Sequence, residues 1–100
     1  MSLYALIGRD RADSLDARLE VRDQHLSRVR ELLAEGRLVL AGPFPAVDAD
    51  EPSKAGFTGS LIVAEFNTLE EAAAWFAHDP YVTTGVFSSH EVRPFMQVLP

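Results

Sequence analysis

Two side chains that can hold an anion and move a proton, Arg22 and His25, interrupt an apolar series with helical spacing. The apolar members stand at positions 15, 19, 26, 29 and 33, so a leucine would fit at position 22. Burying an unpaired guanidinium costs several kcal/mol. We therefore expect Arg22 to meet a partner or a ligand.

On a helical wheel, Arg18 shares the apolar arc with Arg22 and His25, opposite a solvated polar face. One interpretation is a pocket between helix and sheet, where His25 exchanges protons and the arginines hold an anion. The alternative is that the arginine stems pack at the rim with their heads in solvent, and His25 is a satisfied border residue. The pattern leaves both interpretations open.

Three residues further along the chain are candidates for the same pocket. Asp79 would fix the tautomer of His25 and keep it basic, although Asp-Pro dipeptides also commonly end helices. Tyr81 offers a hydrogen-bond donor, but a tyrosine that follows a helix is often a core residue. Ser60 offers a hydroxyl, without the Gly-x-Ser-x-Gly surroundings of a serine hydrolase.

Other chemistries find little support. The chain has no cysteine, which excludes disulfides, thiol nucleophiles and cysteine-bound metals. Asp48 and Asp50 resemble the start of a calcium loop, but Ser53 and Gly59 stand where that loop needs glycine and glutamate. The other two histidines lack metal-site spacing, and no glycine-rich phosphate loop is present. We expect neither a metal nor a cofactor.

Six predicted elements would position the pocket. Strands are expected at 3–8, 37–41, 60–66 and 86–98, and helices at 14–35 and 69–77, the first with a possible kink near Val21. Asp13 or Ser14 would cap the first helix, and a capping box at Thr68 and Glu71 opens the second. The segment Gly42-Pro43-Phe44-Pro45 should end the second strand after Ala41, and Pro94 should place the last strand at an edge or a bulge. Residues 45–59 should form a long loop and 81–85 a short turn.

This order, β-α-β-β-α-β, predicts a ferredoxin-like α+β fold, an antiparallel sheet with both helices on one face. The first and third strands carry apolar side chains in both directions, so the other face would be a contiguous apolar surface. A face-to-face homodimer is the simplest cover. We expect one domain over 1–100.

Charge and composition narrow the function further. The net charge of −6 disfavours nucleic-acid binding, although the basic residues concentrate between Arg9 and Arg37, where they allow a local cationic pocket. No apolar run approaches the ~20 residues of a membrane span, and no signal segment is recognisable. We expect a cytoplasmic protein without nucleic-acid or membrane partners.

Short motifs along nearly the whole chain resemble the YciI-like (YCII-related) family. They are Arg18-Leu-x-x-Arg22-x-x-His25-Leu, Glu35-Gly36-Arg37-Leu38, Ala41-Gly42-Pro43, Ala46-Val47-Asp48, Ala55-Gly56-Phe57-Thr58-Gly59-Ser60, Ala64-Glu65-Phe66, Asp79-Pro80-Tyr81-Val82, Gly85-Val86 and Arg93-Pro94-Phe95. The resemblance implies a ferredoxin-like fold that dimerises through its sheets, a dimeric α/β barrel. It also implies an active site with a His–Asp dyad, here His25 with Asp79, in a pocket lined by Arg22 and Ser60.

The sequence departs from the family pattern at Asp23, where relatives often have a proline that starts the helix. A carboxylate also suits a helix N-terminus. On this interpretation the helix begins at Arg22 and leaves Arg18 in the preceding turn.

Three functional hypotheses follow. The first is a small enzyme of the lyase, isomerase or hydrolase type, using His25 and Asp79 on a small anionic or aromatic substrate. Some members of the family that the chain resembles dehydrochlorinate chlorinated aromatic compounds, which is one reaction that this fold can support. The second is a non-catalytic, metabolite-binding or stress-related dimeric module, and the third is an accessory domain that only dimerises with partners.

Overall fold

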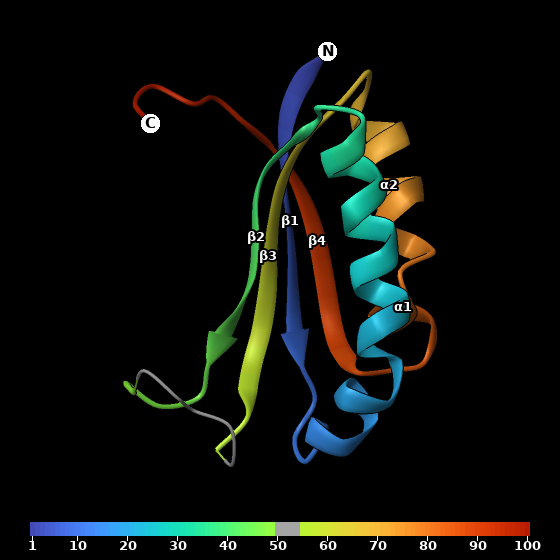
Figure 1. Cartoon of the computed structure of the whole chain (residues 1–100), viewed down its shortest axis with the longest axis vertical. Helices are drawn as coiled ribbons and strands as arrows, with labels where there is room; N and C mark the ends of the chain where they lie inside the picture. Colours follow the sequence, from blue (N-terminus) through green and yellow to red (C-terminus); the bar gives the residue numbers. More distant parts are fainter. Residues whose placement is uncertain (50–54) are drawn as a thin grey trace.

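The computed structural model describes residues 1–49 and 55–100. It shows a four-stranded antiparallel sheet with the helices along one face (Figure 1). The elements are β1 (Ser2–Asp10), α1 (Leu15–Ala34), β2 (Leu38–Pro45), β3 (Phe57–Phe66), α2 (Leu69–Ala77), α3 (Pro80–Thr83) and β4 (Phe87–Phe95). The strand order β2-β3-β1-β4 places the first and third strands at the centre. This is the predicted ferredoxin-like arrangement.

The first helix is continuous over twenty residues, so the kink expected near Val21 is wrong. The alternative start at Arg22 is also wrong, because the Arg18 backbone N–H already donates to the Ser14 carbonyl at 2.8 Å. Ser14 occupies the N-cap position without a side-chain capping bond. The helix gives way to Gly36 at φ 72°, the left-handed conformation that glycine adopts without strain.

The strands differ from the prediction mainly at their ends. β2 runs to Pro45 instead of stopping at Ala41, because an edge strand needs ladder hydrogen bonds on one side only. β1 extends past Gly8 to Asp10, and β4 ends at Phe95 rather than at residue 98. Between α2 and β4 the expected turn is a short helix, α3. The second helix has the predicted bounds, and the Glu71 N–H donates to Thr68 Oγ1.

The core lies between the helices and the sheet, where alternate strand residues point at the helices. Gly8 belongs to this face, and a Cβ there would collide with the ring of Phe87. Because Gly8 has no side chain, the Phe87 ring can lie directly against β1. The same ring packs edge to face against Tyr81, with 5.5 Å between the ring centroids.

The opposite sheet face is apolar over β2, β3 and most of β1, as the two-faced pattern of the central strands predicted, while β4 places the charged Glu91 and Arg93 beside Ile7 and Ala5. It carries Leu3, Ala5, Ile7, Leu61, Val63, Leu40 and Phe44. Leu40 and Phe44, on the edge strand, are 49% and 41% exposed. Figure 1 shows the C-terminal tail leaving the sheet on this side, with Met96, Val98 and Leu99 largely exposed. Within the described ranges, no helix covers this face.

The centre of the expected loop at 45–59, with two positions of the rejected calcium pattern, lies outside the described residues. In the part of the chain that the structure describes, no helix has both the length and the apolar character needed to cross a membrane.

Candidate functional site

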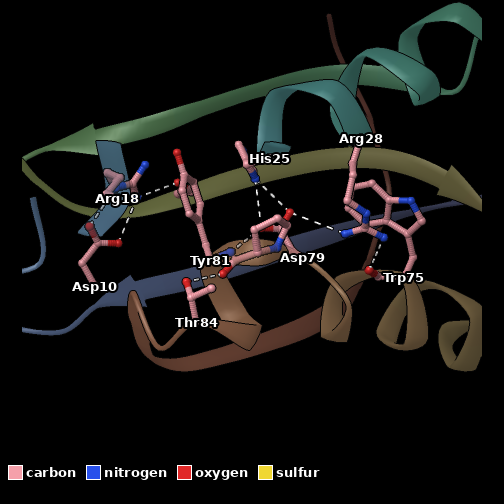
Figure 2. Close-up of polar contacts among 10 residues, drawn as sticks. Asp10, Arg18, His25, Arg28, Trp75, Asp79, Tyr81 and Thr84 are labelled. Atoms are coloured by element: carbon pink, nitrogen blue, oxygen red, sulfur yellow. Dashed lines mark hydrogen bonds and ion pairs between the residues drawn. The ribbon is translucent and has the colours of Figure 1, made fainter. Parts of the chain in front are cut away.

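His25 and Asp79, the predicted pair, meet in the interior (Figure 2). His25 Nδ1 lies 2.8 Å from Asp79 Oδ2 and 3.0 Å from Oδ1. The His25 side chain comes from the middle of α1, and Asp79 comes from the junction between α2 and α3. Asp79 is fully buried, so its carboxylate depends on protein partners instead of water.

Asp79 is also the N-cap of α3. Its Oδ1 accepts a hydrogen bond from the Tyr81 backbone N–H at 2.9 Å. Asp79 therefore has both of the roles expected for it. The same carboxylate caps the helix that follows α2 and orients His25. The fixed backbone of the cap sets the angle at which the carboxylate meets the imidazole.

This contact assigns the protons of the imidazole. An ionised carboxylate only accepts hydrogen bonds, so the facing Nδ1 carries a proton. In neutral His25 the lone pair then lies on Nε2, which has no hydrogen-bond partner among the described residues. His25 also lines the cavity described below, so the imidazole borders the space that a ligand can enter.

Arg18 is a cation that the protein holds through two of its three nitrogens, Nε and Nη2. It donates to both Asp10 oxygens at 2.9 Å, through Nε and Nη2, and Nη2 also donates to Ser60 Oγ at 2.9 Å. A further bond reaches the Gly59 carbonyl at 3.1 Å. Both members of the ion pair are buried, so Arg18 belongs to the pocket wall and not to a solvated turn.

Sequence reasoning missed Asp10 because it ended the first strand at Gly8. The available signal was the alternation of β1: Tyr4, Leu6 and Gly8 face the helices, and position 10 continues that series. A register shift between Arg9 and Asp10 marks an irregularity there. The buried carboxylate that neutralises Arg18 thus lies on a core-facing strand position.

Tyr81 stands between Arg18 and His25 (Figure 2). The Arg18 guanidinium carbon lies 4.5 Å from the ring centroid of Tyr81, a cation–π contact. Burial raises the pKa of Tyr81 above 10.0, against the lowering effects of the Arg18 and Arg22 cations. The phenol therefore keeps its proton at neutral pH and is available as a hydrogen-bond donor.

Arg22 is exposed, which corrects the expectation that it lies inside the apolar stripe. The inward line of α1 consists of Ser14, Arg18, His25, Val29 and Leu32. At 100° per residue, position 22 falls on the flank of that line, and the apolar residues Leu19 and Leu33 are likewise more than half exposed. Arg22 makes no hydrogen bond or ion pair with any described residue. The snorkelling alternative thus holds for Arg22 and fails for Arg18.

A cavity of about 230 Å³ opens between α1 and the β2–β3 side of the sheet. Its polar lining brings together Arg18, Arg22, His25, Ser60 and Tyr81, which are the predicted site residues other than Asp79. Its apolar wall includes Leu19, Leu26 and Phe57. Among the described residues, no group of three or more His, Cys, Asp or Glu side chains is placed to bind a metal.

Comparisons with known proteins agree with this architecture. The family model of the YCII-related domain matches residues 2–96. The chain is 53% identical to Protein YciI of Escherichia coli O6:H1 and of Shigella flexneri over 96 residues, which are 96% of this chain and 98% of each relative. An uncharacterized protein of Haemophilus influenzae is 48% identical over 95 residues, covering 95% of this chain and 97% of that protein.

Two solved structures resemble the fold. The 5-chloro-2-hydroxyhydroquinone dehydrochlorinase of Burkholderia phenoliruptrix, in complex with 2,5-dihydroxybenzoquinone, has a TM-score of 0.83 and 24% identity. The match covers 94% of this chain and 93% of the dehydrochlorinase. A protein of Agrobacterium tumefaciens has a TM-score of 0.53 and 17% identity, covering 96% of this chain and 92% of its own. At these identities the likeness shows the shared fold.

Proposed function

Because this chain belongs to the YCII-related domain family, we propose that it is a small enzyme in which His25 and Asp79 move a proton on a small anionic substrate. The observation that carries the proposal is the contact between His25 Nδ1 and the buried Asp79 carboxylate, at the wall of an open cavity. This contact leaves Nε2 as the atom that takes or gives the proton.

In this proposal the other residues of the site stabilise the charges that form during proton transfer. When Nε2 accepts a proton from the substrate, Asp79 stabilises the imidazolium through Nδ1. The negative charge that forms on the substrate needs cations or donors, and Arg22 and the Tyr81 hydroxyl can supply them. Elimination, isomerisation and hydrolysis all use groups of these kinds, so the proposed reaction is of the lyase, isomerase or hydrolase type.

The charges of the pocket favour a substrate with one negative charge. Arg18 is neutralised by Asp10, so its guanidinium adds little net charge to the lining. Arg22 has no acidic partner among the described residues, and it lies at the wall of the cavity. A carboxylate, phenolate or enolate on a compact apolar body would match Arg22 and the Leu19–Leu26 wall.

The dehydrochlorinase with the same fold supports the class of ligand. That protein was solved with 2,5-dihydroxybenzoquinone, a small planar ring with acidic hydroxyls. A compound of this kind matches the apolar and cationic lining of the cavity. We use it as a probe of the pocket in this chain.

The same pocket also supports a second candidate function, a non-catalytic metabolite-binding or stress-related module. The exposed Arg22 beside an apolar wall is sufficient to hold a small anion without any proton transfer. The two candidates differ in whether His25 is needed for conversion of the ligand or only borders it.

We further propose that the chain is a homodimer that buries its apolar sheet face, and that it acts in the cytoplasm. A contiguous apolar surface on two central strands and one edge strand is unusual for a monomer. A second copy placed face to face would cover it with an identical surface. The exposed apolar tail on the same side would add to that contact.

The test is a screen of small organic acids, including 2,5-dihydroxybenzoquinone, by thermal shift, followed by product detection for every compound that binds. The enzyme hypothesis expects binding by wild type and His25→Asn but conversion only by wild type. His90→Asn, a histidine outside the cavity, is the matched control and should retain conversion. Binding without conversion by wild type would instead favour the metabolite-binding module.

A further inference from the structure

A second cation, Arg28, approaches the buried carboxylate of the dyad. Its Nη1 lies 3.7 Å from Asp79 Oδ2, and Figure 2 shows Asp79 between His25 and Arg28. Arg28 is one turn of α1 beyond His25, so the helix presents a base and a permanent cation to one carboxylate. Neither the sequence pattern nor the lining of the cavity points to Arg28.

Arg28 is held by Trp75 rather than by the carboxylate. Its Nη2 donates to the Trp75 carbonyl at 2.8 Å, and its guanidinium carbon lies 4.2 Å from the Trp75 ring centroid. The two contacts fix the guanidinium plane against α2. The distance from Nη1 to Asp79 therefore follows from packing between the two helices.

The burial of Arg28 Nη1 lowers the stability of the fold if nothing compensates for it. Within the described ranges, Arg28 Nη1 is the buried side-chain nitrogen that has no hydrogen-bond partner. A tether between helices needs only Nη2, and a guanidinium on the surface would avoid this cost. At 3.7 Å the attraction to Asp79 is a charge interaction that needs no hydrogen bond, and it acts in a poorly solvated interior.

We propose that Arg28 is a positioning residue that keeps Asp79 ionised and makes His25 less basic than the carboxylate alone would make it. The inference rests on the proposed function of the dyad. The negative charge of Asp79 faces both His25 and Arg28. Protonated His25 is therefore attracted less strongly to the carboxylate and is also repelled by the nearby Arg28 cation. Arg28 then favours release of a proton that His25 has accepted, a step that acid–base turnover requires.

The other charged and titratable groups around the dyad do not replace Arg28. On α1, Arg22 lies at the cavity, and Arg18 is separated from His25 by the Tyr81 ring and neutralised by Asp10. From the sheet, β3 contributes the uncharged Ser60 to the cavity. At the end of α2, His78 Nδ1 contacts the carbonyl of Ala74 in its own helix at 2.7 Å.

The test is an NMR titration of the three histidines of the whole chain, in wild type and in two variants, with no substrate present. In Arg28→Met, which retains length and removes charge, the titration midpoint of His25 should rise by roughly half a pH unit or more. In Arg28→Lys the cation remains, and the rise should be less than half as large. His90 provides an internal reference that should not move.

An unchanged or lower His25 midpoint in a folded Arg28→Met chain would overturn the proposal. The Tyr81 amide signal reports whether Asp79 still caps α3 and thus whether the carboxylate has kept its place. If Arg28→Met does not fold, Arg28→Gln is read by the same criterion. The readout needs no turnover, so it fails independently of the ligand screen that tests the enzyme hypothesis.

Discussion

The imidazole of His25 lies almost flat on the ring of Tyr81, with ring centroids 4.1 Å apart and planes inclined by 19°. The same ring is in cation–π contact with Arg18. One aromatic ring therefore separates the buried ion pair from the dyad and packs against both. Tyr81 fixes the spacing between the Arg18 guanidinium, which Asp10 neutralises, and the imidazole of His25.

The Tyr81→Phe substitution should change how stability depends on alkaline pH. Burial raises the pKa of Tyr81 above 10.0, so the folded chain keeps the phenol proton at pH values where the unfolded chain releases it. The free energy of unfolding should then fall as the pH rises above about 10, and Tyr81→Phe should lack this part of the fall. Urea unfolding between about pH 8 and 11 measures it. Tyr4→Phe is the control, and parallel wild-type and Tyr81→Phe curves would contradict the prediction.

Breaking the Asp10–Arg18 pair should be strongly destabilising. Asp10→Asn or Arg18→Met leaves a buried group unpaired, which costs about 3–5 kcal/mol in the free energy of unfolding. Because the second substitution removes the orphaned charge, the double variant should lose less than the sum of the single losses. The exposed pair Arg9–Glu91 is the matched control, and Arg9→Met should cost about 1 kcal/mol or less. Additive losses at Asp10 and Arg18 would show that the pair is not coupled.

Two substitutions at Asp79 should separate its roles. Asn is as good an N-cap as Asp, so Asp79→Asn should retain the α3 junction, whereas Asp79→Ala should be less stable than Asp79→Asn by about 1 kcal/mol. Both variants remove the charge facing His25, and both should lose turnover of any substrate by roughly 100-fold or more. Thermal unfolding and single-turnover rates are the measurements. Full activity in Asp79→Asn would refute the dyad.

Arg22→Gln should weaken ligand binding without destabilising the fold. Arg22 is exposed and makes no ion pair with a described residue, so the free energy of unfolding should change by less than about 0.5 kcal/mol. The dissociation constant of an anionic ligand should rise about tenfold, and its dependence on salt should decrease. Arg30→Gln, an exposed arginine of the same helix outside the cavity, should leave binding unchanged. Equal effects at both positions would point to general charge attraction.

A charge on the apolar sheet face should disrupt assembly. Leu40→Glu places a carboxylate on the proposed dimer surface, and light scattering should then give the mass of one chain where wild type gives that of two. Leu33→Glu introduces the same charge at an exposed leucine of α1 and should leave the dimer intact. A monomeric wild type at micromolar concentration would overturn the proposed dimer.

Sequence periodicity was sufficient for the element order, because apolar alternation and helical spacing are local properties. It placed Thr68 at the start of α2 and identified two-faced strands. It failed at strand ends: a proline predicts the end of a central strand, and only the final strand order reveals that β2 is an edge. The extension of β1 to Asp10 depends on pairing with β4, which is equally non-local.

The sequence predicted only part of the candidate site, because local spacing is visible in a sequence and tertiary contacts are not. The spacing of His25 and Arg18 on the helix was informative, Asp79 was a candidate from its residue type, and the family resemblance paired it with His25 across 54 residues. The wheel did not rank Arg18 against Arg22, because their burial depends on how α1 is rotated about its axis over the sheet. Asp10 and Arg28 were missed, since each is recognised by a partner that only tertiary packing supplies.

The double engagement of Asp79 has an evolutionary consequence. Selection for folding alone would retain a side chain that caps α3 at this position, even in a lineage that had lost the reaction, and either aspartate or asparagine can do so. A capping residue at this position in a relative is therefore poor evidence of catalysis. Arg22, which the fold does not require, should be lost soon after the ligand is lost. Its presence or absence across relatives is the better marker of which members still have a substrate.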